Sequence, residues 1–113
     1  MDKARIRELL QDATVDSCDE DEAFWGLFYA LDEGLSFPLQ AQVLGEVASL
    51  VDLDGARSGL RRGVMARVRK GDREYTVALS EVEVLDPDPA SAEWLAVYRY
   101  WLGEDVADLV GPS

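Results

Sequence analysis

Apolar residues recur at helical spacing in the first third of the chain. Residues 2–12 carry apolar side chains three and four positions apart, which predicts a short first helix. We expect the second helix to begin with a capping box of Ser17 and Glu20 and to end at Gly34. Its apolar stripe has the spacing i, i+3, i+4, i+7 and i+11 and consists of Phe24, Leu27, Phe28, Leu31 and Leu35.

After this helix the apolar period changes to two, which indicates β-strands. Residues 37–43 alternate apolar side chains with Gln40 and Gln42, as expected for a strand with one face in solvent. The sequence KGDR predicts a tight hairpin through Gly71-Asp72. After the hairpin, Tyr75, Val77 and Leu79 are expected to point inward. The other expected strands cover residues 46–53, 64–69 and 80–84.

Asp88-Pro89 is a suitable cap and first-turn pair for a final helix. Along this helix Trp94, Tyr98 and Trp101 form one apolar line. The order of elements predicts an α+β fold with N-terminal helices, a small antiparallel SH3-like β-sheet or barrel, and a C-terminal helix. The length of 113 residues predicts a single domain over residues 1–113.

Charge adds most to this picture. The chain has 23 acidic and 11 basic residues and no histidine, which gives a formal net charge of −12. Twelve acids and no Lys or Arg lie between Glu8 and Asp54, whereas seven bases lie between Arg57 and Arg73. We expect those bases mainly to neutralise nearby acids. The overall field repels nucleic acid and anionic membranes and attracts cations or basic proteins.

The missing residue types exclude most catalytic chemistry. Without histidine there is no Ser-His-Asp or Cys-His nucleophile, and the single cysteine, Cys18, cannot build a structural zinc site. We therefore expect no enzyme. One cysteine also forms no internal disulfide, and no apolar run reaches the roughly 18 residues of a membrane span. We expect a cytoplasmic protein that binds neither nucleic acid nor membrane.

Carboxylate oxygen remains in quantity, and hard oxygen ligands suit Ca²⁺ and Mg²⁺. An EF-hand is excluded, because aligning Gly55 of the sequence DLDG with the loop glycine places Leu50 and Arg61 at two ligand positions. Asp32 and Glu33 are more informative. They directly precede Gly34, at the negative end of the second helix, where Lys or Arg is usual. A bound cation would make this arrangement favourable.

The acids fall into groups at the two ends of the second helix. Asp19 and Glu33 are fourteen residues apart, about 21 Å along a helix, so they cannot share one ion. The first group also has an ordinary interpretation, because acids in a first turn stabilise a helix by themselves. Loop aspartates are likewise often turn residues. The candidate ligands are Asp16, Asp19, Glu20 and Glu22 at the first end, Asp32 and Glu33 at the second, and Asp52 and Asp54 as sources of added oxygens.

Residues 15–43, VDSCDEDEAFWGLFYALDEGLSFPLQAQV, resemble the CcbP-like family of calcium-binding proteins. The resemblance lies in the acidic entry at Asp19, the helix end LDE, and the following LSFP. The later sequences YTVALSEVEVL and VYRYW are similar to the family's last strands and C-terminal helix. The chain departs from the family pattern at Leu39, where Phe is expected, and at Cys18, where a bulky residue is common. The resemblance implies calcium binding without EF-hands, through acidic surface clusters.

Two functions are therefore compatible with the sequence. The first is reversible Ca²⁺ binding, as a buffer or sensor. The second is an acidic interaction module of inhibitor or immunity type that masks a basic protein partner, which the charge supports equally well. A hydrolase with paired carboxylates is a remote third, because so small a domain offers little room for a deep pocket.

Overall fold

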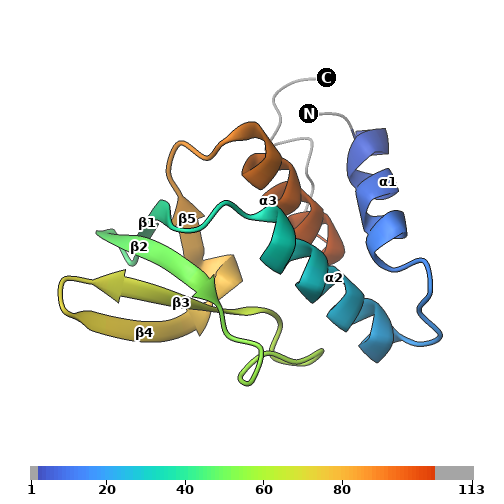
Figure 1. Ribbon diagram of the computed structural model, residues 1–113, viewed down its shortest axis with the longest axis horizontal. Coiled ribbons are helices and arrows are strands. Elements are labelled where there is room, and N and C mark those ends of the chain that lie inside the picture. The colour runs from blue at the N-terminus through green and yellow to red at the C-terminus, as the bar shows by residue number, and fades with distance from the viewer. Residues whose placement is uncertain (1–2, 104–113) are drawn as a thin grey trace. The chain divides into compact units, whose positions relative to one another are not determined.

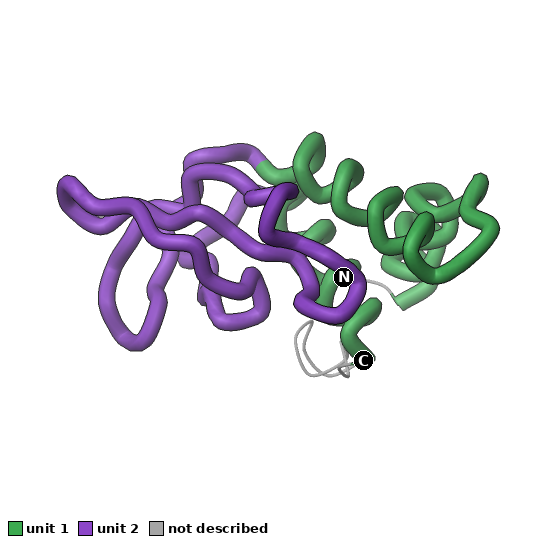
Figure 2. Tube along the Cα trace, turned by 90° about the horizontal axis from the view of Figure 1, so that it is seen from below, with its two compact units in different colours: residues 1–35, 89–113 green, residues 36–88 purple. Residues whose placement is uncertain are grey.

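The computed structural model of the protein describes residues 3–103. The chain forms two compact units: residues up to 35 together with those from 89 onward, and residues 36–88 (Figure 2). The first unit is helical and the second is a β-sheet. This division matches the predicted order of helices, sheet and closing helix. Whether both units act as the one expected domain stays a prediction.

The first unit contains three helices that pack against one another (Figure 1). They are α1 (Lys3–Ala13), α2 (Glu20–Gly34) and α3 (Pro89–Trp101). All three predicted helices are confirmed, with Pro89 in the first turn of α3 as expected. No helix within residues 3–103 is long and apolar enough to cross a membrane.

The predicted apolar stripe of α2 forms the core of this unit. Every member of the stripe is buried, and Ile6 of α1 and Val97 of α3 are completely inaccessible to solvent. The expected line on α3 is confirmed in part, because Tyr98 is buried while Trp94 and Trp101 are half-buried. Burial of these side chains is the main stabilising contribution, at about 25 cal/mol for each Å² of apolar surface.

Both ends of α2 differ in detail from the prediction. The N-cap is Asp19, whose side chain accepts a hydrogen bond from the Glu22 N–H, so the predicted capping box of Ser17 and Glu20 is wrong. At the other end α2 stops at Gly34, but the following Leu35 is extended and no left-handed glycine is involved. The reason for glycine is space, because a Cβ at position 34 would lie 2.2 Å from the Trp94 ring.

The second unit is a five-stranded antiparallel sheet with the strand order β4-β3-β2-β1-β5. Its strands are β1 (Leu39–Val43), β2 (Glu46–Leu53), β3 (Met65–Lys70), β4 (Arg73–Ala78) and β5 (Val82–Val84), with a short 3₁₀ helix over Leu79–Glu81 before β5. The fold is therefore α+β. The strands β4 and β5 stand at opposite edges and the sheet is not closed, so the predicted SH3-like barrel is not confirmed.

The alternation in the strands places one apolar face on the sheet. Ala66 and Val68 are buried as expected, and the two-residue hairpin through Gly71-Asp72 joins β3 to β4. Tyr75 lies on the face of its buried cross-strand partner Val68, as expected, but it is 45% exposed because β4 is an edge strand. The first strand begins at Leu39, two residues later than predicted.

The connection from β2 to β3 is held at its base by side chains. The Ser58 hydroxyl donates a hydrogen bond of 2.7 Å to the Asp54 carbonyl and accepts one of 2.8 Å from the Met65 N–H. Further out, Gly59 and Gly63 exchange two backbone hydrogen bonds. Residues 54–65 therefore form an ordered loop with a closed three-residue tip.

Gly26 supplies a test of the helical packing. A Cβ at this mid-helix position would lie 2.4 Å from the Ala13 carbonyl oxygen of α1. We predict that Gly26→Ala lowers the free energy of unfolding by about 1–2 kcal/mol, because overpacking outweighs the gain of up to about 1 kcal/mol in helix propensity. Urea denaturation at an unchanged m-value measures the difference. The control is Gly59→Ala, where a Cβ has no atom within 4 Å. Equal stability of the two variants would contradict the packing.

Candidate metal centre

The C-terminal end of α2 exposes two neighbouring carboxylates. Asp32 and Glu33 are both exposed, and the last turn of α2 contains no basic residue. Within residues 3–103 neither side chain makes a hydrogen bond or an ion pair. The unpaired carbonyl groups of the last turn add partial negative charge at this end. Like charges therefore gather here without a protein cation to balance them.

The N-terminal end of α2 uses part of its acidic group for capping. One Asp19 oxygen accepts the Glu22 N–H at 2.8 Å, and one Glu22 oxygen accepts the Cys18 N–H at 2.9 Å. The first bond satisfies a backbone donor that the first helical turn leaves free, and the second satisfies the N–H of Cys18, which directly precedes the N-cap. Part of this acidic group therefore stabilises the start of the helix, which was the alternative to metal binding. The second oxygen of each side chain and the exposed carboxylates of Asp16 and Glu20 remain for other partners.

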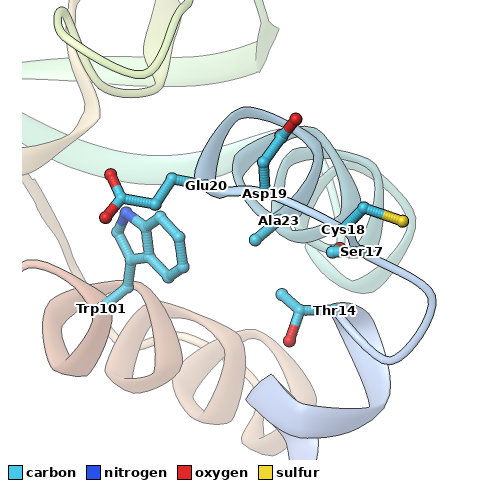
Figure 3. A pocket seen from close by; sticks show the side chains of 7 residues that line it. All are labelled: Thr14, Ser17, Cys18, Asp19, Glu20, Ala23 and Trp101. Carbon is cyan, nitrogen blue, oxygen red and sulfur yellow. The ribbon is translucent and has the colours of Figure 1, made fainter.

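An open pocket of about 600 Å³ lies at this end of α2. Asp19, Glu20 and Cys18 contribute to its wall from the start of α2, and Trp101 contributes from α3. Figure 3 shows the Glu20 carboxylate beside the Trp101 indole ring, while Asp19 points away from that ring. The sequence analysis did not foresee this neighbour, since only tertiary packing brings residue 101 to residue 20.

The other two candidate residues are in the sheet unit and have arginine partners. Asp54 is buried, and its carboxylate accepts the Arg57 N–H at 3.2 Å and the Thr76 hydroxyl at 3.4 Å. Guanidinium groups of Arg57 and Arg67 lie 3.7 and 4.0 Å from it. Arg67 also pairs with Asp52 Oδ2 at 3.4 Å, whereas Asp52 Oδ1 is buried and has no hydrogen-bond partner among residues 3–103.

Other acids of the sheet are neutralised in the same way. Lys70 forms an ion pair with Glu46, and Arg69 pairs with Glu74. The hydrogen bond from Arg69 lowers the pKa of Glu74 below its ordinary value. The expectation that the basic stretch neutralises nearby acids is confirmed. By sequence, the helical unit has fourteen acids to four bases, against nine to seven in the sheet unit, so the excess negative charge belongs to the helices.

The structure keeps the predicted site residues in three groups. The two groups on α2 lie at opposite ends of a fifteen-residue helix, as predicted, and Asp52 and Asp54 belong to the other unit. In the part of the chain from Lys3 to Gly103, no three His, Cys, Asp or Glu side chains stand ready to hold one metal ion. That these acids bind cations stays a prediction. Their all-oxygen composition fits a hard cation such as Ca²⁺.

Comparison with known proteins places these acids in a family context. The family model for CcbP-type calcium binding matches residues 7–102. The crystal structure of Anabaena CcbP is similar, with a TM-score of 0.80, 24% identity and coverage of 92% of this chain and 93% of that chain. No curated protein sequence matches.

A second solved structure, a calcium-binding protein in its calcium-binding form, has a TM-score of 0.75 and 25% identity. The match covers 90% of this chain and 91% of that chain. The first likeness supports the fold, and the family model covers most of the sequence. The resemblance read from residues 15–43 is confirmed. The chain belongs to the CcbP family of calcium-binding proteins.

Proposed function

We propose that the protein binds Ca²⁺ reversibly, as a buffer or sensor, through the acidic groups at the two ends of α2. The observation that supports this most directly is the pair Asp32 and Glu33, exposed at the negative end of a helix with no basic residue in its last turn. A divalent cation there would interact favourably with both carboxylates and with the helix end. No enzymatic role is proposed, since the family is one of calcium-binding proteins.

The site at the N-terminal end of α2 would use Asp16 and Glu20 together with the second carboxylate oxygens of Asp19 and Glu22. Because Asp19 and Glu22 already hold the first turn of α2, an ion there would be coupled to the start of that helix. Ca²⁺ requires six to eight oxygens at roughly 2.3–2.6 Å, so waters and backbone carbonyls would complete the shell. All four side chains are exposed, and only Asp19 and Glu22 are held by these hydrogen bonds.

Asp52 and Asp54 take second place in the proposal. A metal ion at these residues would have to displace or repel Arg67, which already balances their charge. Asp54 would also lose its part in the β2–β3 loop. The buried, unpaired Asp52 Oδ1 is the feature that still argues for an added ligand here.

Calcium should stabilise the native protein against heat. Binding to the folded state alone raises stability by about 2.7 kcal/mol when free ligand is one hundred times Kd. We predict that millimolar CaCl₂ raises Tm by several degrees at constant ionic strength, because the ion also reduces repulsion in a −12 chain. Calorimetry with NaCl of equal ionic strength as control measures the shift. An unchanged Tm, with capture of one stoichiometric basic protein, would favour the interaction module instead.

Removing the two negative charges at the C-terminal end of α2 should weaken calcium binding and leave the fold unchanged. We predict that Asp32→Asn combined with Glu33→Gln removes one binding site in isothermal titration, or weakens it about tenfold or more, since neutral amides replace two anionic ligands. Tm without calcium should stay equal or rise, because unfavourable charge at a helix C-terminus is removed.

The matched control carries Glu81→Gln and Glu83→Gln, two exposed acids outside the predicted sites, with the same change in net charge. Equal titration curves for the two double variants would assign the effect to total charge and remove this site from the proposal.

Two tryptophans allow the ends of α2 to be observed separately. Trp101 lies beside Glu20 (Figure 3), and Trp94 packs on Gly34, next to Glu33. Tb³⁺ accepts the same hard oxygen ligands as Ca²⁺ and emits when an excited indole lies close. We predict that, once the third tryptophan, Trp25 within α2, is replaced by Phe, Trp101→Phe removes sensitised emission from the first site and Trp94→Phe removes it from the second.

The two sites are separated by repeating this measurement with Asp32→Asn and Glu33→Gln present. Only the signal that depends on Trp101 should then remain, and excess Ca²⁺ should displace it. Emission that depends equally on both tryptophans in that background would argue against two separate sites.

A further inference from the structure

The turn between β1 and β2 contains a costly residue. Leu44 and Gly45 form a two-residue hairpin loop closed by the pair Val43 and Glu46. Leu44 has φ 53° and Gly45 has φ 80°, so both are in the left-handed region, where Asn-Gly is the preferred sequence. Leu44 is also 92% exposed. Neither backbone preference nor burial within the chain accounts for leucine at this position.

An apolar groove lies beside this turn on the same unit. It has a volume of about 300 Å³, and its apolar wall includes Val43, Leu44, Val68, Tyr75 and Val77. Tyr75 is 45% exposed on the edge strand β4. A single leucine side chain is small enough to enter such a groove. An exposed apolar tip and an apolar groove thus stand next to each other.

The charges around the groove decide which partner fits. The ion pair between Lys70 and Glu46 lies at its wall. On the face of the sheet that carries the groove, Lys70 and its cross-strand partner Arg73 lie near Glu46, and Asp72 in the adjacent turn makes the numbers of bases and acids equal. A symmetric dimer interface places the same patch against itself, so a patch of balanced charge avoids repulsion between like charges. This locally balanced surface meets that condition in a chain whose net charge is −12.

We propose that this groove is a self-association surface, in which Leu44 of each copy inserts into the groove of a second copy. The exposed leucine supplies the apolar anchor and the mixed charges supply a neutral rim. A strongly basic partner would gain little from a balanced rim and would be drawn to the acidic helices instead. This inference does not depend on the proposed calcium sites.

Sedimentation equilibrium of the full chain without calcium tests the proposal. The weight-average mass should rise with concentration from 12.5 kDa toward twice that value. Added NaCl should strengthen association. It screens the repulsion between the acidic helical units of the two copies, and it leaves the apolar contact intact. Tyr75→Lys should weaken dimerisation about tenfold or more. The charge-matched control is Val47→Lys, which changes a 62% exposed residue paired with Gln42 on the opposite face and should associate like the original chain.

The variant Leu44→Asn distinguishes an effect on self-association from an effect on folding. Asparagine suits the left-handed turn, so Tm should stay equal or rise, while association should fall at least about tenfold. A monomeric mass up to millimolar concentration would overturn the proposal, and so would equal association of Tyr75→Lys and Val47→Lys. Association that weakens with salt would indicate ion pairing in place of apolar contact and would overturn it as well.

Discussion

Repulsion among carboxylates that have no protein cation is the constraint on which the rest of this molecule depends. The sheet unit balances the charge of its acids with ion pairs of its own. Arg67 pairs with Asp52 and Asp54, and Lys70 pairs with Glu46. The helical unit has too few bases to do the same: Arg5 pairs with Glu8 and Glu93, but by sequence the acids outnumber the bases by more than three to one. The burial of the α2 stripe must therefore outweigh this repulsion, and any cation that binds the helices relieves it.

A helix is a suitable scaffold for two such groups. Its rigid backbone keeps the two ends well apart, so an ion bound at one end would leave the carboxylates of the other end unused. The ends also differ electrostatically. Acids at Asp19 and Glu22 contribute to the start of α2 before any ion arrives, whereas Asp32 and Glu33 oppose the helix end. Without an ion, the acids at the first end therefore stabilise the helix, whereas those at the second end destabilise it.

The sequence predicted the elements well because apolar period reports local structure directly. It misplaced the cap of α2, since Ser17 with Glu20 and Asp19 with Glu22 both satisfy the same three-residue spacing. Barrel closure could not be predicted, because it depends on whether the edge strands β4 and β5, which follow one another along the chain, also pair in space. The role of Gly34 required the position of Trp94, and the ion pairing of Asp54 required the position of Arg67 on the neighbouring strand. For the candidate site, residue types and their order along α2 were predictable, whereas the indole neighbours were not.

The Ser58 bridge in the β2–β3 connection has a consequence for how the chain can vary. One hydroxyl joins both ends of this loop, from the Asp54 carbonyl to the Met65 N–H, so the strands behave as if a much shorter segment connected them. The entropy of closing a loop grows only slowly with its length once its base is fixed. The tip at residues 60–62 can therefore accept insertions and deletions over evolution while the register of β2 against β3 is preserved.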